Sequence, residues 1–167
     1  YFIYFMVDGL GMSFPEAGGN AGFLSLLSAP VSVFFFTFSG WLSDKVGRRK
    51  PFVAGAALLM AAALIIAGTA TSFTQFVVAW LVFAVGQAMY LTVDLALCAS
   101  VLPNAKDVGK DMGVFQLALS IPNIAVPLVA PAILAIGSGH NYLLLWGMCA
   151  ILCALGAVAV YQVKTAR

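Results

Sequence analysis

The chain has 167 residues, of which 63% are hydrophobic and only 8% are charged. Because a soluble domain is about one-quarter charged, this composition excludes a water-soluble fold and predicts a protein embedded in lipid. A formal charge of +2 is too small to indicate a nucleic-acid partner.

The apolar residues fall into segments long enough to cross a bilayer as helices, which takes about 20 residues each. These segments are apolar on all sides and lack the alternation of membrane strands, so we expect an all-α membrane protein. Residues 1–7 form a shorter apolar segment, which ends at a Gly-rich turn over residues 9–20 and is interpreted as the end of a further helix. The five complete spans are expected at residues 21–42, 52–70, 73–102, 113–136 and 142–163.

The charged connections predict the orientation of these spans. Connections 43–50 and 103–112 and the C-terminus would lie on one side of the membrane, and together they hold all eight lysines and arginines. The other side would receive Asp8, Glu16 and His140. Because lysine and arginine are retained in cytoplasmic loops, we expect the first side to face the cytoplasm.

No metal, cofactor or catalytic site is expected. Cys149 and Cys153 lie one helical turn apart in an apolar segment with no histidine nearby, so we interpret them, with Cys98, as small buried hydrophobic residues. A membrane enzyme would need paired acids, a metal cluster or a nucleophile with its base at membrane depth. The sequence offers none of these sets, so we expect a protein that is not an enzyme.

The connection after the first complete span reads G-x-x-x-D-K-x-G-R-R-K over residues 40–50. This pattern resembles motif A of the major facilitator superfamily of transporters. In that family motif A follows the second span of a six-span half, so residues 1–7 would be the end of the first span. With the short basic tail after the last span, the resemblance implies that residues 1–167 are the C-terminal half, spans seven to twelve, with the seventh truncated.

The resemblance also implies a cytoplasmic gate. In the family, the acid of motif A contacts a helix N-terminus of the opposite half, where the helix dipole favours negative charge, and the arginines pair with nearby carboxylates. A simpler alternative is that the loop is only a positive anchor for topology. The residues that would form the gate are Gly40, Asp44, Lys45, Gly47, Arg48, Arg49 and Asp94.

The third complete span carries a polar and aromatic stripe. Its members, spaced three or four residues apart, share one helical face: Trp80, Phe83, Gln87, Tyr90 and Asp94. By position this is the tenth span of the family, which lines the central path, and Gln116 and Asn123 of the next span are assigned to the same substrate path. Aromatic rings beside an amide suit a neutral polar solute such as a sugar, although they would also suit a flat apolar one or ordinary helix packing.

Asp94 is the charged residue expected inside a span, and an intramembrane acid is a functional candidate by default. Two roles remain open for it. It could pair with Arg48 or Arg49 of the motif A loop as part of the gate, which we favour, or it could carry a coupling proton.

These features predict a secondary active transporter or facilitator that moves a small solute by alternating access. The alternatives are a non-transporting membrane scaffold or receptor of the same fold, and an exporter of apolar drug-like compounds. We expect a location in the plasma (inner) membrane, with the motif A loop and the C-terminus cytoplasmic. The expected partners are a small-molecule substrate, membrane lipid, the N-terminal half of the same transporter and, for the isolated chain, a second copy that covers the Trp80–Tyr90 stripe.

Overall fold

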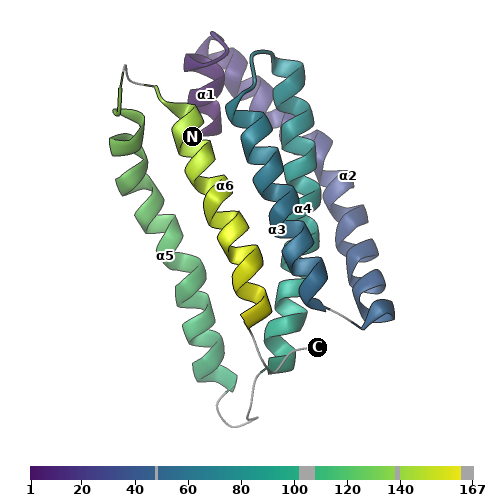
Figure 1. The fold of residues 1–167 in the computed structure, drawn as a ribbon. Coiled ribbons are helices and arrows are strands. Elements are labelled where there is room, and N and C mark those ends of the chain that lie inside the picture. The colour runs from purple at the N-terminus through teal and green to yellow at the C-terminus, as the bar shows by residue number, and fades with distance from the viewer. Residues whose placement is uncertain (48, 102–107, 138–139, 163–167) are drawn as a thin grey trace.

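Helices make up almost all of the computed structural model, and no strand occurs among the residues that it describes. It describes residues 1–47, 49–101, 108–137 and 140–162, and the side chains of these except 95–101, 108, 111, 112 and 115. Figure 1 shows five long helices that run side by side and a short one at their upper end. The elements are α1 (Phe2–Asp8), α2 (Phe14–Val46), α3 (Arg49–Gly68), α4 (Phe73–Val101), α5 (Val108–Leu134), α6 (Tyr142–Ala159) and a 3₁₀ turn, Val160–Gln162.

Helix α2 begins earlier than the sequence predicted. The expected turn over residues 9–20 is wrong, because α2 starts at Phe14, directly after Ser13 in an extended conformation. Pro15 lies in the first turn, where its missing N–H costs nothing, and Glu16 beside it complements the helix dipole. Ala17 is fully buried, which helps to hold this glycine-rich start in a helix.

The junction between α2 and α3 is short and tightly shaped. Gly47 ends α2 with φ 66°, a left-handed conformation that favours glycine, and its N–H donates to the Ser43 carbonyl oxygen at 3.0 Å. Helix α3 then begins at Arg49, so Pro51 lies in its first turn, as expected from the sequence. This junction therefore places Asp44 and Lys45, in the last turn of α2, close to Arg49 and Lys50, in the first turn of α3.

The long helices pack in the order α2, α4, α3 and α6, and α5 packs mainly against α6. Small residues explain how closely α3 approaches its neighbours, since most of its buried positions are alanines. At Gly86 of α4, an added Cβ would lie only 2.7 Å from Met60 Cγ and 3.1 Å from the Ala56 carbonyl oxygen. Such close approach strengthens dispersion, which drives helix association where lipid already solvates apolar side chains.

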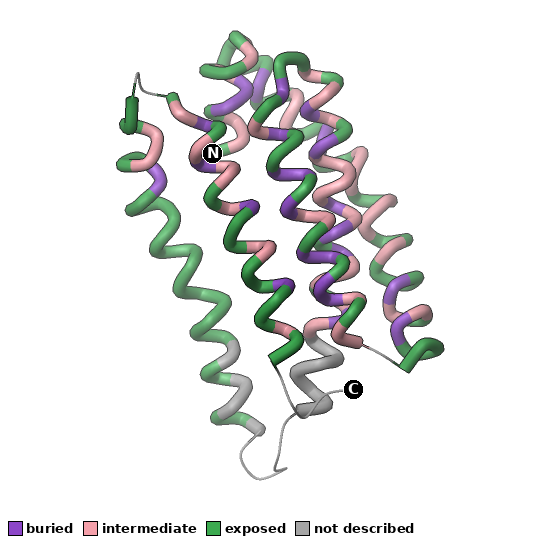
Figure 2. The backbone as a smooth tube through the Cα atoms, in the orientation of Figure 1, coloured by how far each residue is buried: buried purple, intermediate pink, exposed green. Residues whose placement is uncertain are grey.

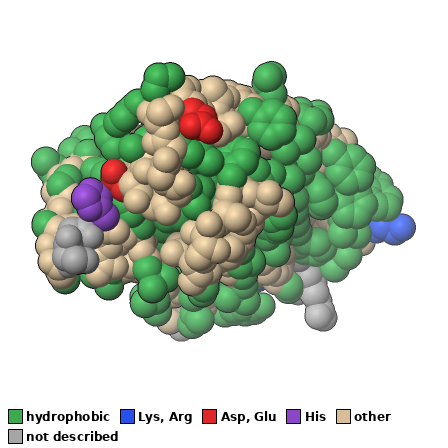
Figure 3. All heavy atoms as spheres, turned by 90° about the horizontal axis from the view of Figure 1, so that it is seen from above, with side chains coloured by type: hydrophobic (Ala, Val, Ile, Leu, Met, Phe, Trp, Pro, Cys, Tyr) green, Lys and Arg blue, Asp and Glu red, His purple; other side chains and the backbone are tan. Residues whose placement is uncertain are grey.

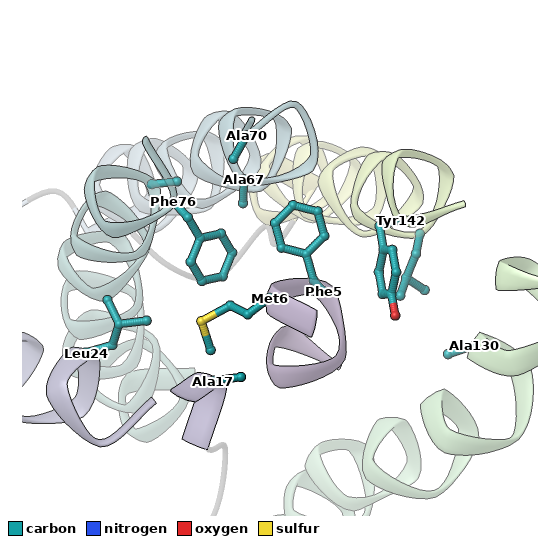
Figure 4. Close-up of a cluster of buried hydrophobic side chains, with 11 residues drawn as sticks. Phe5, Met6, Ala17, Leu24, Ala67, Ala70, Phe76, Ala130 and Tyr142 are labelled. Atoms are coloured by element: carbon teal, nitrogen blue, oxygen red, sulfur yellow. The ribbon is translucent and has the colours of Figure 1, made fainter. Parts of the chain in front are cut away.

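Helix α1 lies on one side of this row of helices, which we call the inner face. Figure 4 shows Phe5 and Met6 of α1 among side chains from α2, α3, α4 and α6, with Ala130 of α5 further away, beyond Tyr142. Phe5 is 4% exposed, and its ring centroid lies 5.3 Å from that of Phe76 on α4 and 5.4 Å from that of Tyr142 on α6. A helix of seven residues is therefore anchored by aromatic packing at one end of the bundle.

The outside of the bundle is apolar. Figure 2 shows α5 exposed along nearly all of its described length, and Leu117, Ile121, Ile124 and Leu128 are each more than 60% exposed. Five helices in the described part of the chain are long and apolar enough to cross a membrane. The protein is therefore an integral, multi-pass membrane protein, as the composition predicted.

Charged side chains gather at opposite ends of the helices. Lys45, Arg49 and Lys50 lie at the junction of α2 and α3, which we call the basic end. The acidic side chains of Asp8 and Glu16 and the imidazole of His140 lie at the other end, which we call the α1 end and which faces the viewer in Figure 3. For these described residues, the basic side chains lie at one end of the helices and Asp8, Glu16 and His140 at the other, as the sequence predicted.

Candidate functional site

The polar and aromatic stripe of α4 meets α1 at its Trp80 end. The Trp80 ring packs against the Phe2 ring of α1, with 4.8 Å between centroids, and against Phe83 at 6.0 Å. Tyr90 packs beside buried residues of α3, and Gln87 between them is exposed. Helix α1 therefore covers the Trp80 end of the stripe, while Phe83 and Tyr90 pack beside α3 and α6.

A small cavity adjoins the stripe between α3, α4 and α6. Its volume is about 50 Å³, and its lining is Ala63, Leu64, Ala67, Phe76, Ala79, Trp80, Phe83 and Trp146. The indole nitrogens of Trp80 and Trp146 are buried and find no hydrogen-bond acceptor among the described residues. Neither nitrogen has accessible surface, so the two indoles act here as packing groups, and the lining of the cavity is apolar.

Trp146 was missed by the sequence analysis. It lies in a uniformly apolar run on α6, and nothing local distinguishes it from a residue that faces lipid. Its position beside Trp80 depends on the packing of α6 against α3, which is a long-range contact. What distinguishes Trp146 is a buried indole N–H without an acceptor, which is rare in proteins. This feature is visible in the structure and has no signal in the sequence.

Gln116 and Asn123 of α5 are not shown to join the stripe. Both are exposed, and α5 packs mainly against α6 rather than against α4. The Asn123 side-chain amide donates to the carbonyl oxygen of Leu119 in its own helix, at 3.0 Å. Their assignment to the substrate path therefore stays a prediction.

The motif A residues form a braced loop at the basic end. An Arg49 Nη2 atom lies 3.3 Å from Asp44 Oδ1, while the Asp44 side chain remains 69% exposed. The Lys45 ammonium lies 4.9 Å from the centroid of the Trp41 ring, close enough for a cation–π interaction. The Asp44 carboxylate is thus held in place from within the loop and is still open to a second partner.

Gly40 of the motif has a packing role. A Cβ at Gly40 would lie 3.1 Å from Thr92 Cγ2 on α4, so glycine allows α2 to approach α4 closely. Ser39 and Ser43, one helical turn apart, are buried, which the sequence analysis did not anticipate. These three small residues bring the start of the motif A loop against the half of α4 that carries Asp94.

Of the predicted contact between Asp94 and Arg48 of motif A, the structure describes the Asp94 side. Asp94 is half-buried and lies on α4 toward the basic end. Arg48 lies outside the described residues, so the pairing of Asp94 with Arg48 stays a prediction. The proton-carrier alternative for Asp94 is equally untested by the described geometry.

The Gly40 contact predicts a specific pair of effects. Gly40→Ala should lower the free energy of unfolding by up to about 1 kcal/mol, because its methyl group displaces Thr92. Thr92→Ser removes the crowding methyl and retains the hydroxyl that donates to the Ala88 carbonyl oxygen at 2.9 Å. In that background Gly40→Ala should be neutral or stabilising, since alanine favours a helix over glycine by about 1 kcal/mol. Unfolding in mixed micelles measures both, and equal losses in the two backgrounds would refute the Gly40 contact.

Comparison with protein families identifies the family of the chain. The family model of the Major Facilitator Superfamily matches residues 1–167, the whole chain. The chain belongs to this superfamily. No protein of curated function and no solved structure was found to match it. The resemblance inferred from motif A is confirmed, and membership of the superfamily makes the protein a membrane transporter in general terms.

Proposed function

We propose that the chain is the C-terminal half of a secondary transporter, and that it moves a small solute across the membrane by alternating access. The observation that supports this proposal is the α4 stripe, in which Trp80 packs against α1, Phe83 and Tyr90 pack beside α3 and α6, and Gln87 is exposed. In a transporter built of two halves, substrate binds at the interface of the repeats near the bilayer midplane. The exposed Gln87 amide lies near the middle of α4, at the depth that such a site requires.

The chemistry of the stripe favours a neutral polar solute, of which a sugar is the best example. Indole and phenol rings offer flat surfaces for the apolar face of a sugar, while the exposed Gln87 amide offers hydrogen bonds. An exporter of apolar drug-like compounds is the second candidate. It is favoured by the cavity beside Trp80, whose lining is entirely apolar or aromatic.

The motif A loop would act as a cytoplasmic latch. Lysine and arginine mark the cytoplasmic side, so the basic end is assigned to the cytoplasm. The exposed Asp44 carboxylate is free to meet a helix N-terminus of the N-terminal half, with Arg49 fixing its position. An exposed ion pair contributes at most about 1 kcal/mol, which suits a contact that must open in every transport cycle.

The N-terminal half of the transporter and membrane lipid would cover the apolar surface of α2 and α5. Phe34 and Trp41 of α2 are 61% and 57% exposed, and the exposed face of α5 is equally apolar. Without the other half, a second copy of the chain would cover the stripe from Trp80 to Tyr90. We therefore expect transport from the complete protein and not from the isolated chain.

Cysteine accessibility tests both the path and its orientation. In the complete transporter without Cys98, Cys149 and Cys153, a membrane-impermeant thiol reagent should label Val46→Cys only from the cytoplasm and Thr71→Cys only from outside. Gln87→Cys should be labelled from either side, because alternating access exposes the path to each in turn.

The matched control for this experiment is Val78→Cys. Val78 lies nine residues from Gln87, half a helical rotation away, and is 51% exposed on the face of α4 that would meet lipid. It should not react with a reagent dissolved in water. Labelling of Val78→Cys in place of Gln87→Cys would overturn the proposed path, and labelling of Val46→Cys and Thr71→Cys from the same side would overturn the orientation.

A further inference from the structure

Three side chains from separate segments meet at the α1 end. The Tyr142 hydroxyl of α6 donates a hydrogen bond to Asp8 Oδ2 at the end of α1. His140 Nε2, from the turn between α5 and α6, lies 3.7 Å from the same oxygen atom. The Asp8 side chain is 28% exposed, whereas the His140 side chain is 68% exposed and open to the solution. None of the three belongs to the stripe or to the motif A loop.

The local backbone positions the histidine for this contact. His140 adopts φ 60°, a left-handed conformation that is uncommon for residues other than glycine. Asn141 beside it caps α6 by accepting the Leu144 N–H at 3.1 Å, and its amide donates to the Ile136 carbonyl oxygen at 3.4 Å. The Asn141 backbone N–H also donates to the Leu134 carbonyl oxygen at the end of α5, at 3.3 Å, so Asn141 is tied to both helices and holds the neighbouring His140 next to the Asp8 carboxylate.

The same residues fasten α1 to the bundle. The Tyr142 ring meets the Phe5 ring edge-on, at 74° between planes, while its hydroxyl binds Asp8 one helical turn further along α1. The seven residues of α1 thus have one apolar and one polar attachment to α6. The polar attachment is the Tyr142–Asp8 hydrogen bond, and a charge on His140 would act on the same Asp8 oxygen atom.

Histidine is the one kind of side chain among the groups around the cluster whose charge ordinarily changes between pH 5 and 8. Tyr4 of α1 and Tyr1 directly before this helix lie near Tyr142. Helix α2, which also packs against α1, brings Glu16 in its first turn, and the ends of α3 and α4 bring only uncharged polar groups in the described chain. Carboxylates are ionised above about pH 4, and imidazoles gain their proton below about pH 6.5.

We infer that Asp8, Tyr142 and His140 form a proton-binding site that fastens α1 to the turn between α5 and α6 when His140 takes up a proton. The ligand is the proton itself, which converts a neutral imidazole beside a carboxylate into an ion pair. Protonation of His140 adds an ion pair to the Tyr142 hydrogen bond on Asp8, and without that proton only the hydrogen bond remains. The assignment of this site to the outer side of the membrane rests on the proposed function, whereas the site itself does not.

Double-mutant cycles at two pH values test the inference on the complete transporter in detergent, without any substrate. The variants are Asp8→Asn and His140→Asn, and asparagine tolerates the left-handed conformation that position 140 requires. At pH 5.5 the two changes should be coupled by about two- to fivefold in the unfolding equilibrium constant, the range of a partly exposed ion pair. At pH 7.5 this coupling should vanish.

Two further cycles serve as controls. Asp8→Asn with Tyr142→Phe should show coupling at both pH values, because that hydrogen bond does not depend on the histidine. Glu16→Gln with His140→Asn should show none, since Glu16 forms no ion pair with His140 in the described structure. Equal Asp8–His140 coupling at pH 5.5 and pH 7.5, or its absence at pH 5.5, would overturn the proton site. Neither outcome bears on transport, which the cysteine labelling tests separately.

Discussion

Replacing Phe5 with alanine should release α1 from the bundle and lower the free energy of unfolding by about 2–4 kcal/mol. Phe5 is 4% exposed and contacts the rings of Phe76, Tyr142 and Trp146, with the last centroid at 6.5 Å. The loss is mainly one of dispersion contacts, because lipid solvates apolar groups about as well as a protein interior does. Equilibrium unfolding of the complete protein in mixed micelles measures it.

The matched control is Phe14→Ala. Phe14 also contacts an aromatic ring of α1, that of Tyr4 at 5.9 Å, but it is 58% exposed at the start of α2. Its loss should cost less than about 1 kcal/mol, as expected for an exposed side chain. If the two variants lose stability equally, α1 is not anchored through Phe5 and the packing at the α1 end is wrong.

Replacing Gly86 with alanine should force α3 and α4 apart and cost about 1–3 kcal/mol. The new Cβ would lie 2.7 Å from Met60 Cγ, 3.1 Å from the Ala56 carbonyl oxygen and 3.2 Å from the Met60 nitrogen. Two of these three atoms belong to the backbone, so no rotamer change relieves the crowding. Equilibrium unfolding in mixed micelles measures this loss. In the Gly86→Ala background, Met60→Ala should restore only the part of the lost stability that is due to the clash with the Met60 side chain.

Gly55→Ala on α3 is the control for Gly86→Ala. A Cβ at Gly55 meets nothing within 4 Å, and alanine is the better helix former. This variant should be neutral or more stable than the natural sequence. Stabilisation by both substitutions would mean that α3 and α4 do not approach each other at Gly86.

Local sequence signals predicted most of the fold because the membrane restricts the choice to helices. Apolar length alone located the five spans, and Pro51 correctly indicated the start of α3. The start of α2 was placed too late, because Gly18 and Gly19 suggested a turn. Pro15 in the first turn and the burial of Ala17 outweigh those glycines.

The candidate site could be predicted only where its signal was periodic. Spacing along α4 was enough to place Trp80, Phe83 and Gln87 on one face. The meeting of Asp8 with Tyr142 joins residues 134 positions apart, and no pattern within either segment indicates it. Trp146 escaped for the same reason, since its role depends on how α6 packs against α3 and not on its neighbours in the chain.

Uptake of radiolabelled solutes into proteoliposomes is the most direct test of the proposed transport function. The complete transporter should carry a neutral sugar with saturable kinetics. Gln87→Ala should reduce that uptake at least tenfold, the effect of losing about 1.4 kcal/mol of binding, whereas Val78→Ala should leave it unchanged. Uptake that is equal in both variants would contradict a path along the α4 stripe. Saturable export of an apolar dye without sugar transport would contradict the preferred substrate class, and no movement of any solute by correctly inserted protein would contradict the transporter itself.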